Sequence, residues 1–411
     1  MSSQVATRDG HSRVSIKTVH GALNLPADQA AVQYVPSTEW VRTYTPNTVG
    51  SWSTYSEFLL APDALPDTID VVTLVMQLSA ATKTGGTVIS TVGDAHWLSR
   101  LIEVSVGSEL ISSIYPESGY LRSILHVPSE TKSKLMPAAG NAAVATRRTA
   151  TAAGQTLAVN IPIPFLLKGG YLTKSQAAPL RIKVYHANLS DIVQTDGTAP
   201  VMSIAALSLN ISGRSFQSQA SLGAVINTQR KLGRVDQRYL DPVQMQVALA
   251  SGSAQFTIQL QSLVGLYDHL LFVVRAASSV STALANDPTA FVTCQSYNLK
   301  DSGGNVIVPE ITSAYALGPM LAKYCSGDAT DIASGLGTVQ KNVYSMWFGS
   351  RPEESLHKGT GYGYAKLTGL ERLQITFASA LSANHVCDVI GFQLANLSND
   401  AVGSVKKTVV A

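Results

Sequence analysis

The sequence predicts an all-β protein made of two consecutive antiparallel eight-stranded jelly rolls, with short helices in the loops. Three observations lead to this fold class. Apolar and polar residues alternate with a period of two in many short segments. Gly, Pro, Asn and Asp separate these segments, as they do at turns between strands. The segments also fall into two groups of similar length, and little of the chain has the pattern of a long helix.

In the first half of the chain, the alternation is clearest in three segments. Because side chains point to opposite faces of a strand in turn, each segment predicts a strand with one face in a core. The apolar residues of the three segments are Leu157, Val159, Ile161, Ile163 and Phe165, then Leu180, Ile182 and Val184, then Leu207, Leu209 and Ile211.

The second half of the chain repeats this pattern. Polar residues such as Gln and Thr occupy the positions between the apolar ones, so one face of each strand is expected to remain polar. The apolar residues are Val243, Met245, Val247 and Leu249, then Phe256, Ile258 and Leu260, then Leu373, Ile375 and Phe377.

The two groups of strands define the expected domains. Sandwiches of this length exceed the roughly 100 residues of a minimal immunoglobulin-like domain, whereas jelly rolls with long loops accommodate it. The stretches 127–156 and 276–290 are rich in turn-forming and small residues and are expected to be such loops. We expect an N-terminal arm and first strand at 1–34, a first jelly roll at 35–212, a polar and basic linker at 213–236, a second jelly roll at 237–404 and a C-terminal tail at 405–411.

The composition suits a protein whose sides are covered by neighbours. Of the 411 residues 45% are hydrophobic, and only 14% are charged, against roughly 25% in an ordinary soluble domain. Ser, Thr, Ala and Gln fill the polar positions instead. The alternative is a weakly charged secreted β-domain. The formal net charge is +3, and no dense basic segment is present of the kind that condenses nucleic acid, so direct nucleic-acid binding is not expected.

Cysteine usage and hydropathy predict a protein made in a soluble form inside a cell. The three cysteines, Cys294, Cys325 and Cys387, are sparse and odd in number, so they do not make a disulfide framework. This cysteine usage favours a reducing compartment. The N-terminal residues are polar and lack the apolar core of a signal peptide. No apolar run approaches the roughly 20 residues that a bilayer-spanning helix needs.

Three groups of residues could carry catalytic or metal chemistry, and each has a simpler structural interpretation. His385 and Cys387 have metal-ligand spacing, but no second pair exists to complete four ligands. Asp94 and His96 could form a catalytic pair beside Trp97, yet no serine lies in a Gly-x-Ser-x-Gly elbow, and a loop histidine beside a packing tryptophan is favoured. Glu353 and Glu354 could be an acid and base, but a solvent-exposed loop is favoured. No catalytic, cofactor or metal site is predicted.

Possible binding features are equally weak. The turn at 359–363 has neither the Gly-Lys-Ser/Thr end of a phosphate loop nor the spacing of a dinucleotide fingerprint, so it is interpreted as a tight turn that needs positive φ. Tyr362, Tyr364 and Trp52 could bind glycans, which defines the main alternative function: a jelly-roll lectin or viral spike. The basic pairs at 147–148 and 230–231 do not make a nucleic-acid groove.

The order of these landmarks resembles that of the double-jelly-roll major capsid proteins of large eukaryotic DNA viruses, virophages and polinton-like viruses. The resemblance covers most of the chain as a pattern of strands and turns. A Pro-Ser that the family often has before Gly359 is absent. The landmarks are the apolar run and polar turn from Trp97 to Leu110, the Pro-interrupted strand Val159–Phe165, the strand Ala178–Val184, the strand Val343–Phe348, the turn Leu356–Tyr364, the closing strands 370–377 and 388–394, and the final turn Asn396–Gly403.

The resemblance implies a structural protein rather than an enzyme. It implies a homotrimer whose six jelly rolls make a pseudo-hexagonal capsomer, with capsomers tiled into an icosahedral virion shell. Expected partners are further copies of the chain, penton proteins and minor capsid proteins, and an internal membrane is left open. A cyclic trimer of this kind needs two different matching faces on each subunit.

Overall fold

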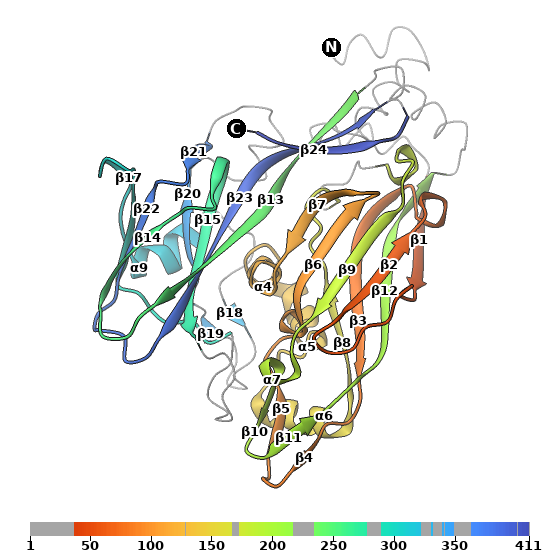
Figure 1. Ribbon diagram of the computed structural model, residues 1–411, viewed down its shortest axis with the longest axis horizontal. Helices are drawn as coiled ribbons and strands as arrows, with labels where there is room; N and C mark the ends of the chain where they lie inside the picture. Colours follow the sequence, from red (N-terminus) through yellow and green to blue (C-terminus); the bar gives the residue numbers. More distant parts are fainter. Residues whose placement is uncertain are drawn as a thin grey trace.

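The protein consists of two β-sandwiches that lie side by side (Figure 1). All but two of the paired strands in the described residues belong to one sandwich or the other, and every pairing is antiparallel, which confirms the all-β fold class. The computed structural model describes residues 37–127, 129–166, 172–216, 234–277, 289–321, 330–331, 339–340, 342–348, 363–400 and 402–410.

The first sandwich contains two four-stranded sheets with crossed connections. One sheet has the order β1-β12-β3-β8 and consists of β1 (Ser37–Tyr44), β12 (Ile204–Phe216), β3 (Thr68–Leu78) and β8 (Gln155–Asn160). The other has the order β2-β9-β6-β7 and consists of β2 (Tyr55–Leu60), β9 (Leu180–His186), β6 (Ser99–Val106) and β7 (Glu109–Ile114).

Short elements extend both ends of the first sandwich. They are the strand pairs β10 (Val193–Thr195) with β5 (Ile89–Thr91) and β11 (Thr198–Val201) with β4 (Thr82–Thr84), and the helical turns η1 (Pro62–Ala64), η2 (Ala95–Leu98), η3 (Thr173–Ser175) and α7 (Leu189–Ile192). The turns η1 and η3 lie at the Thr68 end of β3, and the others lie at its Leu78 end.

The second sandwich repeats the two-sheet plan. Its inner sheet has the order β13-β23-β15-β20, with β21 added to β15 and β24 added to β23. These strands are β13 (Arg234–Leu249), β23 (His385–Asp400), β15 (Val264–Ala276), β20 (Tyr344–Trp347), β21 (Ala365–Thr368) and β24 (Val405–Val409).

The outer sheet of the second sandwich has the order β14-β22-β16-β17. It consists of β14 (Gln255–Gln259), β22 (Arg372–Thr376), β16 (Ser296–Lys300) and β17 (Val306–Thr312). The remaining described elements are the turns α9 (Ser313–Tyr315) and η4 (Ala316–Met320) and the small pair β18 (Thr330–Asp331) and β19 (Val339–Gln340).

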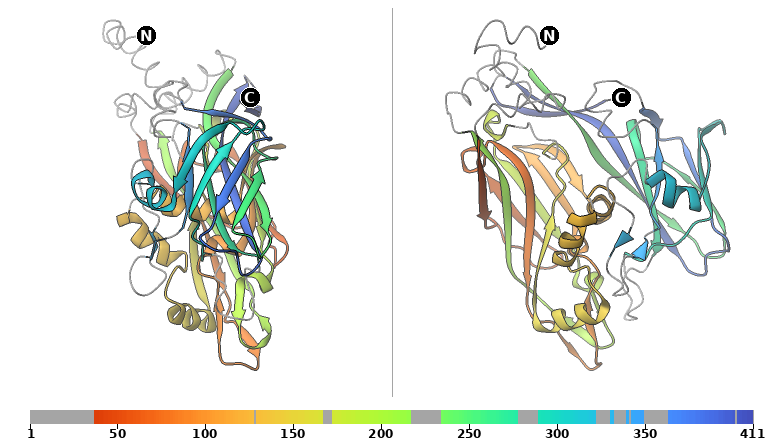
Figure 2. Two further views of the ribbon diagram at one scale, coloured as in Figure 1. Left: turned by 90° about the vertical axis from the view of Figure 1, so that its left-hand side faces the viewer. Right: turned by 180° about the vertical axis from the view of Figure 1, so that it is seen from behind.

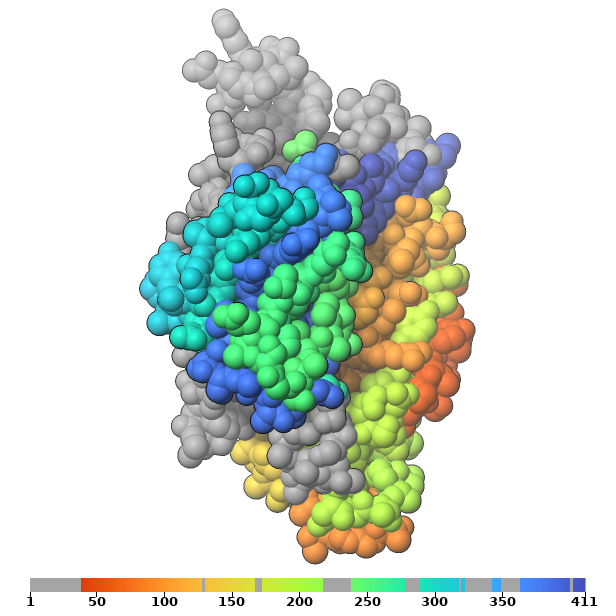
Figure 3. All heavy atoms as spheres, turned by 60° about the vertical axis from the view of Figure 1, so that its left-hand side comes forward, coloured from red at the N-terminus to blue at the C-terminus, as the bar shows by residue number. Residues whose placement is uncertain are grey.

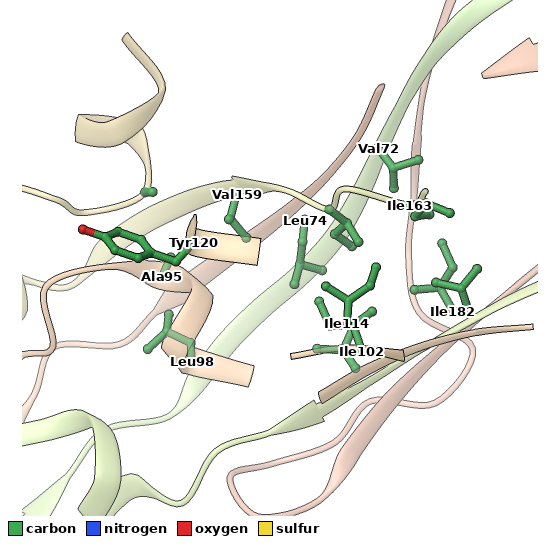
Figure 4. Close-up of a cluster of buried hydrophobic side chains, with 14 of the residues drawn as sticks. Val72, Leu74, Ala95, Leu98, Ile102, Ile114, Tyr120, Val159, Ile163 and Ile182 are labelled. Carbon is green, nitrogen blue, oxygen red and sulfur yellow. The ribbon is translucent and has the colours of Figure 1, made fainter. Parts of the chain in front are cut away.

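Each sandwich encloses an apolar core whose side chains come from facing sheets. In the first core, Leu74 and Val159 on one sheet meet Ile102, Ile114 and Ile182 on the other (Figure 4). The alternating positions expected from the sequence point inward: Leu180, Ile182 and Val184 of β9 are buried, and so are Leu207, Leu209 and Ile211 of β12. Burial of this apolar area provides the main stabilisation of each sandwich.

The predicted strand over 157–165 is correct only in its first part. Leu157, Val159, Ile161, Ile163 and Phe165 are all buried, as the alternation required. The strand β8 nevertheless ends at Asn160, because Pro162 and Pro164 have no N–H to donate to a neighbouring strand. The chain stays extended enough to keep the alternation while it leaves the hydrogen-bonded sheet.

The long loop predicted over 127–156 is part of the connection between β7 and β8, and it carries short helices of the kind expected in the loops. This stretch contains α5 (Ser129–Ala138) and α6 (Val144–Ala153). Ala, Lys, Leu, Met and Arg have high helix propensity, and Arg147 and Thr151, four residues apart, form the buried side of α6. The Cys325 thiol, most of the predicted loop at 276–290 and the whole arm at 1–34 lie outside the described residues.

The strands extend beyond two of the expected domain limits. β12 continues to Phe216 and β13 begins at Arg234, so both ends of the expected linker 213–236 are strand. Residues 405–409 were expected in a C-terminal tail, but they form β24, which pairs with β23 from Asn399–Val405 to Ala395–Val409. The expected C-terminal tail was therefore wrong for residues 405–409.

In the described part of the chain, no helix has both the length and the apolar character that a membrane crossing requires.

The strand β15 is buried on both faces, and this generates a matched test. Leu270 lies in the core of the second sandwich, and its neighbour Leu271 lies in the core cluster of the first. We expect Leu270→Ala and Leu271→Ala each to lower the free energy of unfolding by about 2–5 kcal/mol, since both create a cavity in packed surroundings. Denaturant titration measures this.

The exposed Val306→Ala serves as the control and should change the free energy of unfolding by less than about 0.5 kcal/mol. A loss at Leu271 as small as that of the control would show that the face of β15 toward the first sandwich is not a core.

Candidate functional site

The two sandwiches meet along one flank of each, and we call this region of contact the inter-sandwich flank. Among the described residues it is the region that we consider as the candidate functional site. It is formed by the outer face of the β13-β23-β15-β20 sheet on one side and by α4 (Pro116–Leu125), β7 and their surroundings on the other. Figure 3 shows the second sandwich lying directly against the first, and Figure 2 shows α4 and α5 on the side of the first sandwich that faces the second.

Apolar packing makes the inter-sandwich flank a continuation of the first core. Alternate residues of β15 enter different cores: Phe272 and Val274 enter the second, whereas Leu271 and Val273 join the first. β23 divides in the same way, with Val389 in the second core and several later residues in the first. Those are Ile390, Phe392, Ala395 and Leu397.

The helix α4 lies at the centre of the inter-sandwich flank. Pro116 occupies its first turn, where the missing N–H is harmless, and Glu117 follows with a carboxylate that favours the helix N-terminus. Tyr120 is fully buried and packs edge-on against Trp97 of the first sandwich and Phe291 of the second, at centroid distances of 4.9 and 6.2 Å. One aromatic side chain therefore contacts both sandwiches.

A buried charged network crosses the inter-sandwich flank beside α4. Arg275 of β15 donates from Nη2 to Glu117 Oε1 at 2.8 Å and from Nε to Asp388 Oδ2 of β23 at 2.7 Å. Their exposed fractions are 9%, 5% and 0%. Gln244 and Gln246 of β13 donate to the remaining oxygens, Glu117 Oε2 at 3.0 Å and Asp388 Oδ1 at 2.8 Å. We call these five residues the Arg275 network.

The Arg275 network holds two carboxylates against one cation. Burial, with the nearby Asp388 carboxylate, raises the pKa of Glu117 above its ordinary value despite the opposing Arg275. The two carboxylates in turn raise the pKa of Arg275, so the guanidinium stays charged. Removing the cation alone would leave buried negative charge unpaired, which is strongly unfavourable.

A second polar cluster ties the C-terminal strand to the first sandwich. Lys407 of β24 forms an ion pair through Nζ with Asp241 of β13, and its backbone N–H donates to Glu109 Oε1 of β7 at 3.0 Å. Ser112 of β7 donates to the other Asp241 oxygen at 2.7 Å. Burial raises the pKa of Asp241, although Lys407 opposes it. The strand β24 therefore contacts both sandwiches through charged groups.

Near the C-terminus of α4, His269 of β15 is held between two aromatic rings. Its imidazole stacks on Trp347 at 4.0 Å and on Phe392 at 4.1 Å, and Nδ1 lies 2.8 Å from Asp268 Oδ2. The His126 ring approaches its edge at 6.3 Å. Burial lowers the pKa of both histidines, and the cation Arg122 lowers them further.

Among the described residues that were considered as candidates for catalysis, Asp94 and His96 form a hydrogen-bonded pair. Asp94 caps η2 by accepting from the His96 N–H at 2.9 Å, and its Oδ1 lies 2.5 Å from His96 Nδ1. No hydroxyl or thiol is hydrogen-bonded to His96 Nε2 among the described residues. The pair fixes the local conformation of η2, in agreement with the structural interpretation.

The remaining candidates are not brought together. His385 Nδ1 lies 2.7 Å from the Ala383 carbonyl oxygen, and Cys387 is buried in the second core. Within the described residues, no three His, Cys, Asp or Glu side chains are arranged to hold a metal ion. Trp52 donates from Nε1 to the Met202 carbonyl oxygen at 2.6 Å, and its ring packs against His186. These contacts contribute to the packing of the first sandwich.

The structure describes only some of the other residues that were considered for binding or catalysis. Glu353, Glu354 and Tyr362 lie outside the described residues, as does the pair at 230–231. Gly363, the last residue of the tight turn expected at 359–363, has φ of +103°, and residues 359–362 lie outside the described residues. Tyr364 is half-buried.

The sequence analysis missed the residues of the inter-sandwich flank. The helix α4 carried a detectable signal, because Pro116 and Glu117 mark a start and the apolar residues Tyr120, Leu121, Ile124 and Leu125 recur at helical spacing. The Arg275 network carried none, since its charged members come from three distant segments.

The fold is similar to those of solved viral capsid proteins at low sequence identity. The PBCV-1 protein VP54, fitted into a cryo-EM reconstruction of the virophage Sputnik, is 10% identical with a TM-score of 0.64, covering 92% of this chain and 98% of that chain. The Faustovirus major capsid protein is 8% identical with a TM-score of 0.62, covering 92% and 91%. A chain of the Sputnik virophage structure is 12% identical with a TM-score of 0.61, covering 90% and 88%.

No protein-family model and no curated protein sequence matches this chain. The structural likeness covers 92% of the chain and both sandwiches, so the chain has the double-jelly-roll fold.

The Arg275 network gives a test of the inter-sandwich flank. Arg275→Met removes the cation and leaves Glu117 and Asp388 buried, so we expect the free energy of unfolding to fall by about 3–5 kcal/mol. Arg214→Met is the matched control, because Arg214 pairs with Asp70 at 3.6 Å on the surface and contributes at most about 1 kcal/mol. Equal effects of the two substitutions in denaturant titrations would contradict a buried network.

His269 predicts a loss of stability in acid. Because burial lowers its pKa in the folded state, the unfolded chain binds the proton more readily, so stability present above the ordinary pKa of about 6.5 is lost as the pH falls through it. The variant His269→Phe keeps the stack and removes the titration. Its free energy of unfolding should depend less steeply on pH than that of the native chain between about pH 7 and about pH 5.

The raised pKa of Glu117 acts in the opposite direction, since a group with that shift favours the folded state more as the pH falls. For this reason the comparison is made between slopes. Identical slopes in the native chain and the variant would show that His269 does not contribute.

Proposed function

We propose that this chain is the major capsid protein of an icosahedral virus, a structural protein with no catalytic role. The observation that carries the proposal is the pair of consecutive jelly rolls, a fold that is similar to those of PBCV-1 VP54 and the Faustovirus major capsid protein over about nine-tenths of the chain. The alternative of a glycan-binding module has less support, because the Trp52 ring is partly buried against the first core and donates its N–H to the Met202 carbonyl oxygen.

The rigid junction supports this role. A capsomer subunit must hold its two jelly rolls in a constant relative position, or six of them cannot form one regular block. The shared core, the Arg275 network and the polar contacts of Lys407 in β24 together restrain the two sandwiches. A flexible tether between the sandwiches would not have this effect.

Exposed apolar residues on edge strands supply surfaces for contacts between copies. β17 is an edge strand whose Val306 is 59% exposed and whose Ile307 is also exposed, and β1 is another edge strand with exposed Val41. An uncovered edge of this kind is a ready site for association. Pro309 lies in β17, where the absence of an N–H is tolerated at an edge.

We infer that three copies form a pseudo-hexagonal trimer through two different faces of each subunit, and that trimers pack into the shell. Penton and minor capsid proteins would complete that shell, and an internal membrane beneath it is compatible with the proposal. The domain limits that we propose are a first jelly roll from the N-terminal arm to the end of β12 and a second from the start of β13 to β24.

Light scattering on the purified chain tests self-assembly. We expect a trimer at micromolar concentration, and we expect electron microscopy to show hexagonal blocks or shells. Val306→Asp with Ile307→Asp should shift the trimer toward monomer, because burying an unpaired charge opposes association. Val49→Asp, an exposed position outside the named strands, is the control. A native chain that stays monomeric would contradict the proposal.

A further inference from the structure

The two sandwiches share one strand plan. When the main strands of each sandwich are counted along the chain, both sandwiches have one sheet in the order 1-8-3-6 and one in the order 2-7-4-5. The sheet β1-β12-β3-β8 is therefore the equivalent of β13-β23-β15-β20, and β17 is the equivalent of β7. The helical turn α9 directly follows β17, just as α4 directly follows β7.

The inter-sandwich flank uses one of the two equivalent surfaces from each sandwich. The outer face of β13-β23-β15-β20 binds β7 and α4: Tyr239 of β13 donates to the Ile111 carbonyl oxygen of β7 at 3.1 Å, and Gln244 of β13 donates to Glu117 of α4 at 3.0 Å. The equivalent surfaces are the outer face of β1-β12-β3-β8, which we call the β3 face, and β17 with α9, which we call the β17 edge. The second sandwich does not lie over the β3 face in the view from behind (Figure 2).

The middle of the β3 face is a row of uncharged hydrogen-bonding side chains, one from each strand. Thr43, Asn210, Thr73 and Asn160 stand in register across the sheet. Thr43 donates to Asn210 Oδ1 at 2.8 Å and Thr73 donates to Asn160 Oδ1 at 2.7 Å, which leaves the amide N–H groups of both asparagines available to a neighbour.

The rows beside this one are also uncharged. Val75 stands beside Ser208 on one side, and Val71 stands beside Ser212 on the other. From the row of Val71 to the row of Gln77, no outward position of the described sheet carries a charged side chain.

Such a surface is unusual, because exposed protein surface normally carries charged residues of both signs, whereas the centre of an interface is depleted of them. The other sheet of the same sandwich shows the usual pattern: its outer face carries Glu57 paired with Arg181 at 2.9 Å, together with Glu103 and Lys183. The β3 face therefore has the composition of a covered surface, although nothing in the second sandwich of the same copy covers it.

The β17 edge has complementary properties. Val306, Ile307 and Tyr315 expose 59%, 39% and 52% of their surface. The Glu310 carboxylate accepts from Ser296 of β16 at 2.6 Å. In the described residues β17 pairs with β16 alone, so one side of its main chain offers N–H and C=O groups to a neighbour. Apolar side chains beside unpaired main-chain groups suit a face of valine, serine, threonine and asparagine.

We propose that the β3 face of one copy binds the β17 edge of a second copy, in the way that the equivalent surfaces bind each other at the inter-sandwich flank. This inference rests on the proposed capsid function and names the two different faces that its trimer requires. Internal and intermolecular contacts of the same kind then alternate, so that three copies close a ring of six sandwiches.

Photochemical crosslinking of the full chain tests the proposal. Tyr315 is replaced by the photoreactive residue benzoylphenylalanine, which keeps an aromatic ring at an exposed position. After irradiation of the trimer, we expect denaturing gels to show linked dimers and trimers. Mass spectrometry should locate the links in the segments 37–44, 68–78, 155–160 and 204–216 of another copy.

A charge placed on the β3 face gives an independent measurement. Thr73→Lys should weaken association of the copies about tenfold or more in light scattering, because an unpaired charge in a covered surface is unfavourable. Thr257→Lys is the matched control, since Thr257 is exposed on β14, at the opposite edge of its sheet from β17, and this variant should remain trimeric. Circular dichroism should show native strand content in both variants.

The outcomes separate this inference from the proposed function. A trimer whose Tyr315 links fall on other surfaces, or that forms no links between copies, overturns the pairing of the β3 face with the β17 edge and leaves the capsid function in place. Equal association of the Thr73→Lys variant and the native chain also overturns the pairing. A native chain that stays monomeric contradicts both.

Discussion

The whole arrangement depends on one sheet that is buried on both faces. In β15 and β23, successive side chains enter two different cores, so the inner sheet of the second sandwich also completes the core of the first. Such strands have almost no solvent-exposed face and resemble the strands of sheets that are covered on both sides. The two sandwiches therefore cannot separate without exposing apolar surface, and they behave as one unit.

Polar groups at this flank must satisfy each other because water is excluded. Arg275 bridges a helix of the first sandwich and a strand of the second, and Gln244 and Gln246 occupy the remaining carboxylate oxygens. Buried ion pairs add little net stability compared with apolar packing, but they penalise any arrangement that breaks them. The network therefore favours one relative position of the sandwiches.

The helix α4 connects several of these features. Its first turn supplies Glu117 to the Arg275 network, its centre places Tyr120 between two cores, and its last residues approach His269.

The period-two pattern alone determined the β class and the inward residues of six strands, β8, β9, β12, β13, β14 and β22, because alternation is a local consequence of strand geometry. It placed Leu180, Ile182 and Val184 correctly, and it kept Ile161 to Phe165 buried even beyond the end of β8. The pattern could not show that both faces of β15 are covered, nor that Glu117, Arg275 and Asp388 meet. Those contacts join residues more than 100 positions apart, and only the packing of complete sheets brings them together. Residues 405–409 were expected in a tail, but in the tertiary structure they form a strand. The reason is that the part of β23 from Ala395 to Asn399 has an edge with which these residues can form hydrogen bonds.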